Sequence, residues 1–443
     1  MNKLRSLKLL VALSPGIFAA SILAQTTNTT TSSPPSTQVS ETSTASPEDN
    51  RVIATQDQPA YYAAAIDGTG LIALDTGAPG HFLFGVTVSG GRDSNPDTLG
   101  NGVASPFYTA SPYLAAQLNT AKSQYLFQYQ LTTTGYNSDY GRQTLSAGSA
   151  RIVSNPSERL SLGFDSMITY GQDAVRFLGS QQTVPVGDVA GTGPNSAAYL
   201  PNAGHLTYIN SGLGGTYHFS SRNSLQLLGR DSYGSDSTYQ GSNSISTASV
   251  GFDRDLSPTL GASVYVQNYY YYGSIRCESY GAGVGLEWKP REKTAFSLTG
   301  GPQFDAPECN AKQGFSFNAS MNTNLNGKSQ LYLLAGRQPA TSYLGPGLWQ
   351  DNISGGYQRQ VTSTGLVNLD MGYVSSTSLV TVNSYSGTYF DCIYSYGLGH
   401  GLLASYTYRG YFGDSGGTHI GRNLAMFSLN WAPRRAVSLF KFN

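Results

Sequence analysis

Charged residues are scarce in this sequence of 443 residues: they make up 12% of it, about half the share of an ordinary globular protein. Lys and Arg together number 26, as do Asp and Glu, so the formal net charge is zero. A strongly basic nucleic-acid-binding protein and a protein with an acidic tail are therefore excluded as default interpretations.

Long apolar runs are also missing beyond the N-terminus. No later stretch approaches the roughly 18 apolar residues that a membrane-spanning helix needs, so the sequence predicts no helical span. Cysteine is rare too: the three that occur are not closely spaced, which argues against a metal site, and we expect no cofactor.

The first residues have the pattern of a secretory signal peptide, with a basic start and an apolar stretch, and we assign residues 1–24 to it. A membrane anchor is the weaker alternative, because Ser14-Pro15-Gly16 interrupts the apolar stretch. Residues 25–57 are rich in Ser, Thr and Pro, which predicts a disordered linker. Residues 58–80 form a short segment ahead of the first predicted strand, and we expect that segment to lie in the periplasm.

Glycine and tyrosine are abundant instead, with 52 and 31 residues. Apolar residues alternate with small or polar ones at a period of two, which predicts strands with two different faces. Across residues 280–288, for example, Tyr, Ala, Val, Leu and Trp alternate with Gly and Glu. Similar runs of about eight to ten residues, the length of a tilted membrane-spanning strand, lie at 260–267, 315–322, 367–373, 402–409 and 425–431.

Short polar turns separate these runs, near residues 120–122, 155–157, 221–223, 255–257, 290–292, 324–327, 360–363 and 397–400. Longer connections lie between the turns, the longest at 172–204. Short periplasmic turns and long extracellular loops are typical of a transmembrane antiparallel up-and-down β-barrel. Counting from Phe82 predicts an all-β barrel of about 18 strands, with a range of about 16–20. A soluble propeller is the alternative, but charge confined to strand ends favours the barrel.

The end of the chain leaves two possibilities. Trp431-Ala432-Pro433-Arg434 resembles Trp288-Lys289-Pro290-Arg291, which precedes a tight turn. We expect the barrel, within residues 81–443, to close at about Trp431 and to be followed by a short tail. The alternative is that residues 437–442 form the true last strand.

Aromatic residues support a membrane, because Tyr and Trp prefer the interface between lipid and water. Trp288 and Trp431 precede tight turns on the apolar face, and the Tyr269–Tyr272 run lies at a strand end. We therefore predict interface positions, which are Tyr269, Tyr271, Trp288, Tyr408 and Trp431.

The stretch 85–95 resembles the first strand of Gram-negative outer-membrane porin-like barrels, ending in an Asp93-Ser94-Asn95 turn. The stretch 111–136 resembles their next hairpin. The resemblance covers about residues 81–431, and its motifs are common to barrels in general. It implies a bacterial outer-membrane location with outer-membrane lipid around the barrel, and it does not identify a solute.

The interior of such a barrel is expected to be polar. By alternation, five charged residues face inward as candidates for the pore lining, namely Arg230, Asp253, Glu287, Asp370 and Arg409. The alternative is that they pair with other charges or lie at solvated rims. Residues 172–204 are the candidate for a loop that folds inward as a constriction, although a surface loop is equally consistent.

Enzymatic chemistry is not expected. The five histidines form no metal-spaced pair, and no Gly-x-Ser-x-Gly motif occurs. Asp75-Thr76-Gly77 resembles the active-site loop of an aspartic protease, but such enzymes need two loops and only one is present. Export to an oxidising compartment would permit a disulfide between Cys277 and Cys309, which fall in neighbouring loops, and would leave Cys392 over.

The sequence thus favours a passive outer-membrane pore for small hydrophilic solutes, with no nucleic-acid partner and with a homo-oligomer left open. A barrel that serves surface polysaccharide export or adhesion is the second hypothesis. A barrel enzyme that modifies lipid or peptide is the third.

Overall fold

The computed structural model describes residues 80–96, 102–120, 122–137, 141–172, 205–236, 241–272, 276–291, 293–309, 313–326, 328–342, 345–362, 364–378, 384–399, 401–415, 417–432 and 437–438. The predicted signal peptide and linker, the segment before residue 80, and the predicted constriction loop from residue 173 onward lie outside the described residues. The Asp75-Thr76-Gly77 motif lies outside them as well.

Long antiparallel strands make up almost all of the described chain. In chain order they are β1 (Gly80–Asp93), β2 (Ser105–Asn119), β3 (Ser123–Tyr136), β4 (Arg142–Ser157), β5 (Leu160–Gly171), β6 (Leu206–Ser220), β7 (Asn223–Asp236), β8 (Gly241–Ser257), β9 (Leu260–Tyr272), β10 (Cys277–Arg291), β11 (Thr294–Asp305), β12 (Gln313–Asn326), β13 (Ser329–Ser342), β14 (Gly345–Gln360), β15 (Gly365–Ser378), β16 (Ser384–Gly399), β17 (Leu402–Ser415), β18 (Thr418–Trp431) and β19 (Val437–Ser438).

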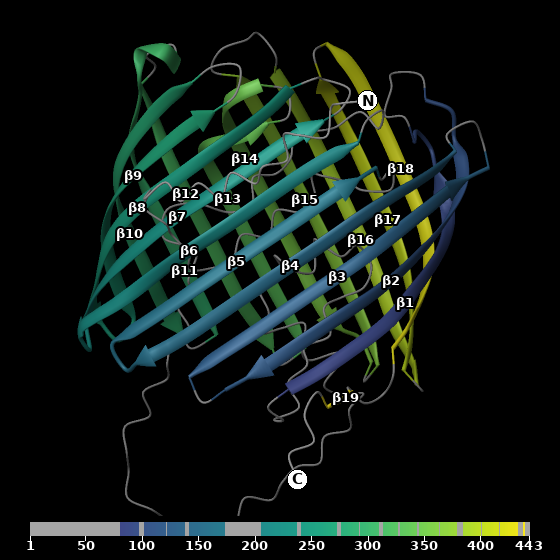
Figure 1. The fold of residues 1–443 in the computed structure, drawn as a ribbon, viewed down its shortest axis with the longest axis horizontal. Helices are drawn as coiled ribbons and strands as arrows, with labels where there is room; N and C mark the ends of the chain where they lie inside the picture. Colours follow the sequence, from purple (N-terminus) through teal and green to yellow (C-terminus); the bar gives the residue numbers. More distant parts are fainter. Residues whose placement is uncertain are drawn as a thin grey trace, which may run out of the picture.

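These strands form a closed barrel, because each of β1 to β17 pairs with the next and β18 pairs with β1. The closing pair places Val86 opposite Trp431 and Asp93 opposite Leu424. The strands are tilted, with β1 to β9 in front of β10 to β18 in Figure 1. The prediction of about 18 strands closing at Trp431 is confirmed. The alternative last strand is wrong, because β19 only bridges to β1 at His81 and Phe82.

The two ends of the barrel differ. All eight predicted turns are found within a few residues, between β2 and β3, β4 and β5, and so on to β16 and β17; we call this the turn end. At the opposite end, the loop end, the extended connections are 94–104, 172–205 and 306–312. Long loops are fewer there than predicted, because the strands have 12 to 17 residues and continue past the regular alternation.

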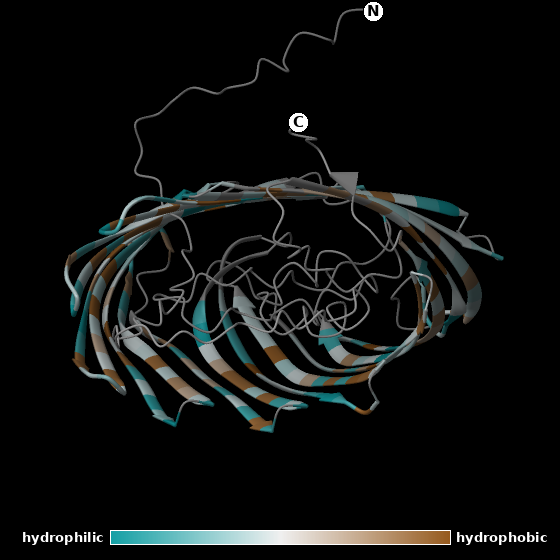
Figure 2. Cartoon of the chain, turned by 90° about the horizontal axis from the view of Figure 1, so that it is seen from below, coloured by the Kyte–Doolittle hydropathy of each residue, from teal (hydrophilic) through white to brown (hydrophobic). Residues whose placement is uncertain are grey.

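Each strand has an apolar outer face and a polar inner face. On β18, Phe427, Leu429 and Trp431 are exposed on the outside, whereas Ser428 and Asn430 are buried on the inside. Figure 2 shows the resulting bands of hydrophobic and hydrophilic residues along the strands. This is the alternation that a membrane-spanning barrel requires, since the outer face meets lipid and the inner face does not.

Among the described residues, no helix is both long and apolar enough to traverse a bilayer.

Glycine and tyrosine form a repeated contact on the inner wall, which accounts for part of their abundance. A Cβ added to Gly372 would lie 2.6 Å from Cε1 of Tyr389, and one added to Gly387 would lie 2.5 Å from the hydroxyl of Tyr411. The tyrosine ring thus occupies the space beside the glycine of the neighbouring strand. The bare glycine leaves room for this ring, so the two residue types are needed together.

Candidate functional site

The interior of the barrel is the candidate site, and one of its walls holds a buried ion pair. Arg230 of β7 directs its guanidinium at Asp165 of β5, with Nη2 3.3 Å from Oδ2. Its Nη1 also donates to Asn210 Oδ1 at 3.4 Å, on the intervening β6. Arg151 of β4 stands opposite Asp165 in the strand register. The predicted lining residue Arg230 is therefore paired with an acid that lies 65 residues away in sequence.

A second buried pair lies on β16 and β17. Arg409 donates from Nε to Asp391 Oδ2 at 2.9 Å, and both side chains are almost fully buried. Asp370 of β15 lies opposite Asp391 in the strand register. The predicted residues Asp370 and Arg409 therefore flank an acid that the sequence analysis did not select, in a row of two carboxylates and one guanidinium.

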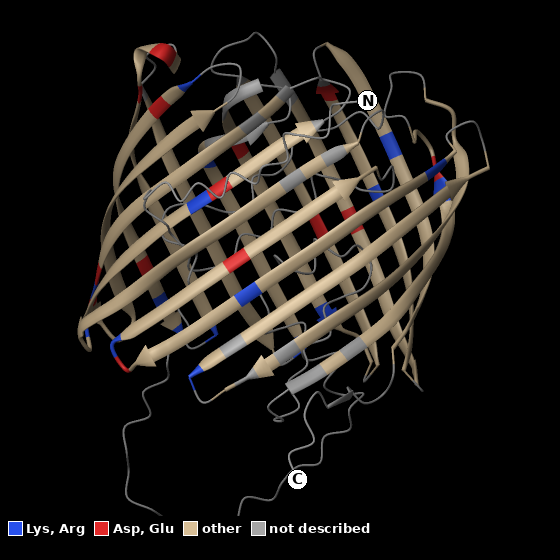
Figure 3. Ribbon diagram, viewed as in Figure 1, with Lys and Arg blue, Asp and Glu red and all other residues tan. Residues whose placement is uncertain are grey.

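The other two predicted lining residues lie toward the turn end. Asp253 is partly buried and accepts a hydrogen bond from Ser224 Oγ at 3.4 Å. Glu287 is half exposed and pairs with Lys289 Nζ at 2.8 Å. By their place in the alternation all five candidates lie on the inner face, and three of them belong to ion pairs. Figure 3 shows how sparse charge is along the wall as a whole.

The seam between the first and last strands carries a third buried pair. Arg422 of β18 donates from Nε to both oxygens of Asp93, at 3.0 and 3.2 Å, and also from Nη2 to Oδ2. Tyr136 donates to the same carboxylate at 3.3 Å. The Asp93-Ser94-Asn95 turn is closed by the Asn95 N–H, which donates to Asp93 Oδ1 at 3.0 Å. Arg422 was not identified from sequence.

The predicted interface aromatics divide into two groups. Trp288, Trp431 and Tyr408 are 47%, 40% and 37% exposed on the outer face, with both tryptophans near the turn end. Tyr408 lies in mid-strand and donates to Asn423 Oδ1 at 2.9 Å.

The prediction for Tyr269 and Tyr271 is corrected by the structure. They are 4% and 1% exposed, on the same face of β9 as the buried Tyr265 and Gln267. In a run of four tyrosines the composition is the same on both faces, so alternation does not reveal which two face lipid. Tyr272, at 41% exposed, belongs to the outer face.

A disulfide fastens the loop end above these tyrosines. Cys277, the first residue of β10, is bonded to Cys309, which lies in the short helix η2 (Pro307–Cys309) after β11. Cys309 is fully buried and forms a cluster with Ile245, Tyr269 and Tyr271. The disulfide therefore ties the connection between β11 and β12 to the inner wall. Cys392, on β16, is a free cysteine.

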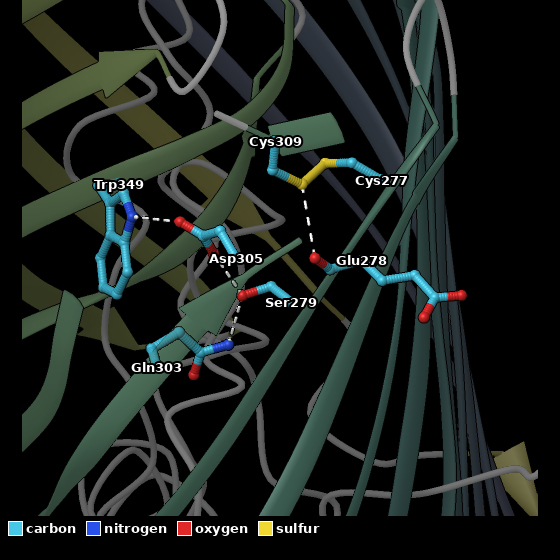
Figure 4. The surroundings of a disulfide bond; sticks show 7 residues. All are labelled: Cys277, Glu278, Ser279, Gln303, Asp305, Cys309 and Trp349. Carbon is cyan, nitrogen blue, oxygen red and sulfur yellow. Dashed lines mark hydrogen bonds between the residues drawn. A yellow bond between two sulfur atoms is a disulfide. The ribbon is translucent and has the colours of Figure 1, made fainter. Parts of the chain in front are cut away.

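A chain of buried hydrogen bonds runs beside the disulfide, as Figure 4 shows. Gln303 donates to Ser279 Oγ at 2.6 Å, and Ser279 donates to Asp305 Oδ1 at 2.5 Å. The other oxygen of Asp305 accepts the indole N–H of Trp349 at 3.4 Å. Asp305 and Trp349 are both over nine-tenths buried. Since Asp305 is on β11 and Trp349 on β14, this bond spans the two strands between them.

The hairpin of β13 and β14 leaves the wall at this point. β13 pairs with β12 only as far as Arg337, and β14 pairs with β15 only from Leu348 onward. Between these positions the two strands pair only with each other. Their Cα atoms come within 8 Å of β7, β8 and β9, which are separated from β13 along the wall by at least three strands. The described ends of β13 and β14 therefore bend over the loop-end mouth of the barrel toward β7, β8 and β9.

No catalytic constellation is found in the part of the chain that the structure describes. Those residues contain no group of three or more His, Cys, Asp or Glu that could hold a metal ion. His419 is exposed and lies against Asp414 at the loop end, and His205 and His218 lie at opposite ends of β6. The side chains of His81 and His400 lie outside the described set.

No family model and no curated protein matches this chain. Among solved structures it is similar to OccK7 (OpdD) of Pseudomonas aeruginosa, with a TM-score of 0.43, 9% identity, and 82% of this chain and 100% of that chain covered. It is also similar to the siderophore receptor PiuA of Acinetobacter baumannii, with a TM-score of 0.43, 9% identity, and 79% and 81% covered. OprD of Pseudomonas aeruginosa gives a TM-score of 0.39, 8% identity, and 82% and 96% covered.

Proposed function

We propose that this protein is an outer-membrane pore that admits small hydrophilic solutes by passive diffusion. The observation that supports this best is a closed barrel of eighteen strands with an apolar outer face and a polar inner face. Barrels of 16 to 18 strands are wide enough to leave an aqueous channel unless something fills them. Outer-membrane lipid would then surround the outer face.

The inner wall supports a channel of weak charge preference. Arg230, Arg409 and Glu287 each have a partner of opposite sign within 3.3 Å. Paired charges present little net field to a passing ion, whereas an unpaired ring of one sign would select against ions of that sign. The solute class we propose is therefore small and polar, with no requirement for a particular net charge. We also propose that the protein acts without catalysis.

Single-channel recording in a planar bilayer tests this function. Refolded protein is added to one side, and its folding is checked by β-structure in circular dichroism and by heat-modifiable migration. Discrete steps that scale with salt concentration are the expected result. Folded protein that inserts into the bilayer but gives no steps would reject passive diffusion and favour an export or structural role.

A further inference from the structure

The free part of the β13–β14 hairpin lies where it can limit the pore. It begins beyond Arg337 and ends before Leu348, and β13 and β14 come within 8 Å of β7, β8 and β9, which are not their neighbours in the wall. A chain that crosses the mouth narrows the passage whatever its side chains are. The hairpin must be held in this position, however, because beyond Arg337 and before Leu348 it does not pair with β12 or β15.

The described contacts identify what holds it. Trp349 lies at the base of the free part and donates its indole N–H to Asp305, with two strands between them. The guanidinium of Arg337, on the other arm, lies 5.4 Å from the centre of the Trp349 ring. Gly314 of β12 makes room for the indole, since a Cβ there would lie 2.5 Å from Trp349 Cζ2. The base of the hairpin is thus seated on the inner wall of β11 and β12.

The position of Asp305 depends in turn on its own surroundings. Ser279 donates to its second oxygen, and the residue that follows, Ala306, donates its N–H to the Glu278 carbonyl at 2.9 Å. Three residues further on, Cys309 is bonded to Cys277. The disulfide thus holds one end of the short segment 305–309 against β10, and the hydrogen bonds of Ser279 and Ala306 hold the other end.

We propose that the Cys277–Cys309 disulfide and Asp305 together act as a lock that holds the β13–β14 hairpin across the mouth through Trp349. Asp305, Trp349 and the two cysteines are positioning residues that set the aperture of the pore. The inference rests on the proposed pore function, and its central claim about the hairpin can be measured without ion flow.

The first test is hydrogen–deuterium exchange of the full-length protein in detergent, followed over the peptides of β13 and β14. Cys277→Ser with Cys309→Ser, Asp305→Ala and Trp349→Phe should each speed exchange near the hairpin base by about tenfold or more, because each releases a buried contact that holds the base in place. Cys392→Ser and Asp253→Ala are the matched controls and should leave exchange there unchanged. Unchanged exchange in all three lock variants would overturn the lock.

The second test is conductance of the same variants. A variant in which Asn-Gly replaces residues 339–347 removes the free part of the hairpin without touching Asp305. We expect larger steps in this variant and in the lock variants, and no further increase when Asp305→Ala is added to the shortened hairpin. Larger steps in the shortened variant alone would overturn the lock but leave the pore intact. If no variant gave conductance steps but exchange was faster in the lock variants, the pore would be rejected and the lock retained.

Discussion

Arg230 shows how much stability depends on one buried charge. Its guanidinium Nη2 lies 3.3 Å from Asp165 Oδ2, and both side chains are about nine-tenths buried. We predict that Arg230→Gln destabilises the barrel by about 3–5 kcal/mol, because it leaves a buried carboxylate uncompensated. Urea unfolding in detergent, followed by tryptophan fluorescence, measures this.

The matched control is Lys289→Gln, at the pair with Glu287, where both side chains are at least one-third exposed. An exposed ion pair stabilises a protein by about 1 kcal/mol or less, so this change should leave the free energy of unfolding almost unchanged. Equal losses in the two variants would contradict the role given to burial.

Gly372 provides a second prediction for a single residue. An added Cβ would lie 2.6 Å from the Tyr389 ring, which is buried and has little room to move. Gly372→Ala should therefore destabilise the barrel by about 1–3 kcal/mol through overpacking. At Gly148 the nearest atom to an added Cβ is 3.8 Å away, so Gly148→Ala should be neutral or slightly stabilising. A loss at Gly148 as large as at Gly372 would mean that glycine is needed for another reason than the ring contact.

At the scale of strands, the seam between β1 and β18 closes the barrel, and Arg422 forms a buried ion pair at its loop end. Its guanidinium binds Asp93, which is fully buried and also accepts a hydrogen bond from Tyr136 of β3. We predict that Arg422→Ala prevents or greatly weakens closure, seen as loss of the heat-modifiable band after refolding. Arg92→Ala, which removes an exposed outer-face guanidinium from β1 beside Asp93, should refold normally. Normal refolding of Arg422→Ala would show that backbone pairing alone closes the seam.

The elements themselves could be predicted because each strand repeats one simple pattern. Lipid on one side and a polar interior on the other impose a period of two, and polar turns mark where the pattern stops. The predicted strands were too short, because the alternation of apolar and polar residues weakens where the strands extend beyond the apolar band. The hairpin of β13 and β14 was missed because leaving the wall changes no face pattern. Two features of the sequence indicated weak strand pairing there, namely Pro339 and the Gly345-Pro346-Gly347 stretch. Proline has no backbone N–H to donate, and glycine has no side chain to pack against a neighbouring strand.

The candidate site was predicted less completely, for a related reason. Alternation places Arg230 and Arg409 on the inner face, but their partners depend on which strands lie side by side. Asp165 and Asp391 occupy inward positions and could have been selected by parity, whereas the pairing itself follows only from the register. The hydrogen bond from Trp349 to Asp305 forms only because the β13–β14 hairpin leaves the wall and lies against β11, so no local sequence pattern predicts it.

At the scale of the whole molecule, the balance of charge on the wall determines which ions the proposed pore prefers. Near Arg409 that balance rests on a row of two carboxylates, Asp370 and Asp391, and one guanidinium. We predict a reversal potential close to zero for the unmodified protein in a KCl gradient. Arg409→Gln should shift it toward the K⁺ equilibrium potential, because two inward carboxylates then lose their cation, and the shift should shrink at high salt as screening increases. Arg92→Gln removes the same charge from the outer face and should leave the potential unchanged. A conducting Arg409→Gln variant with no shift, or with a shift toward Cl⁻, would show that ions do not pass this row, and the permeation path would then have to lie along another wall.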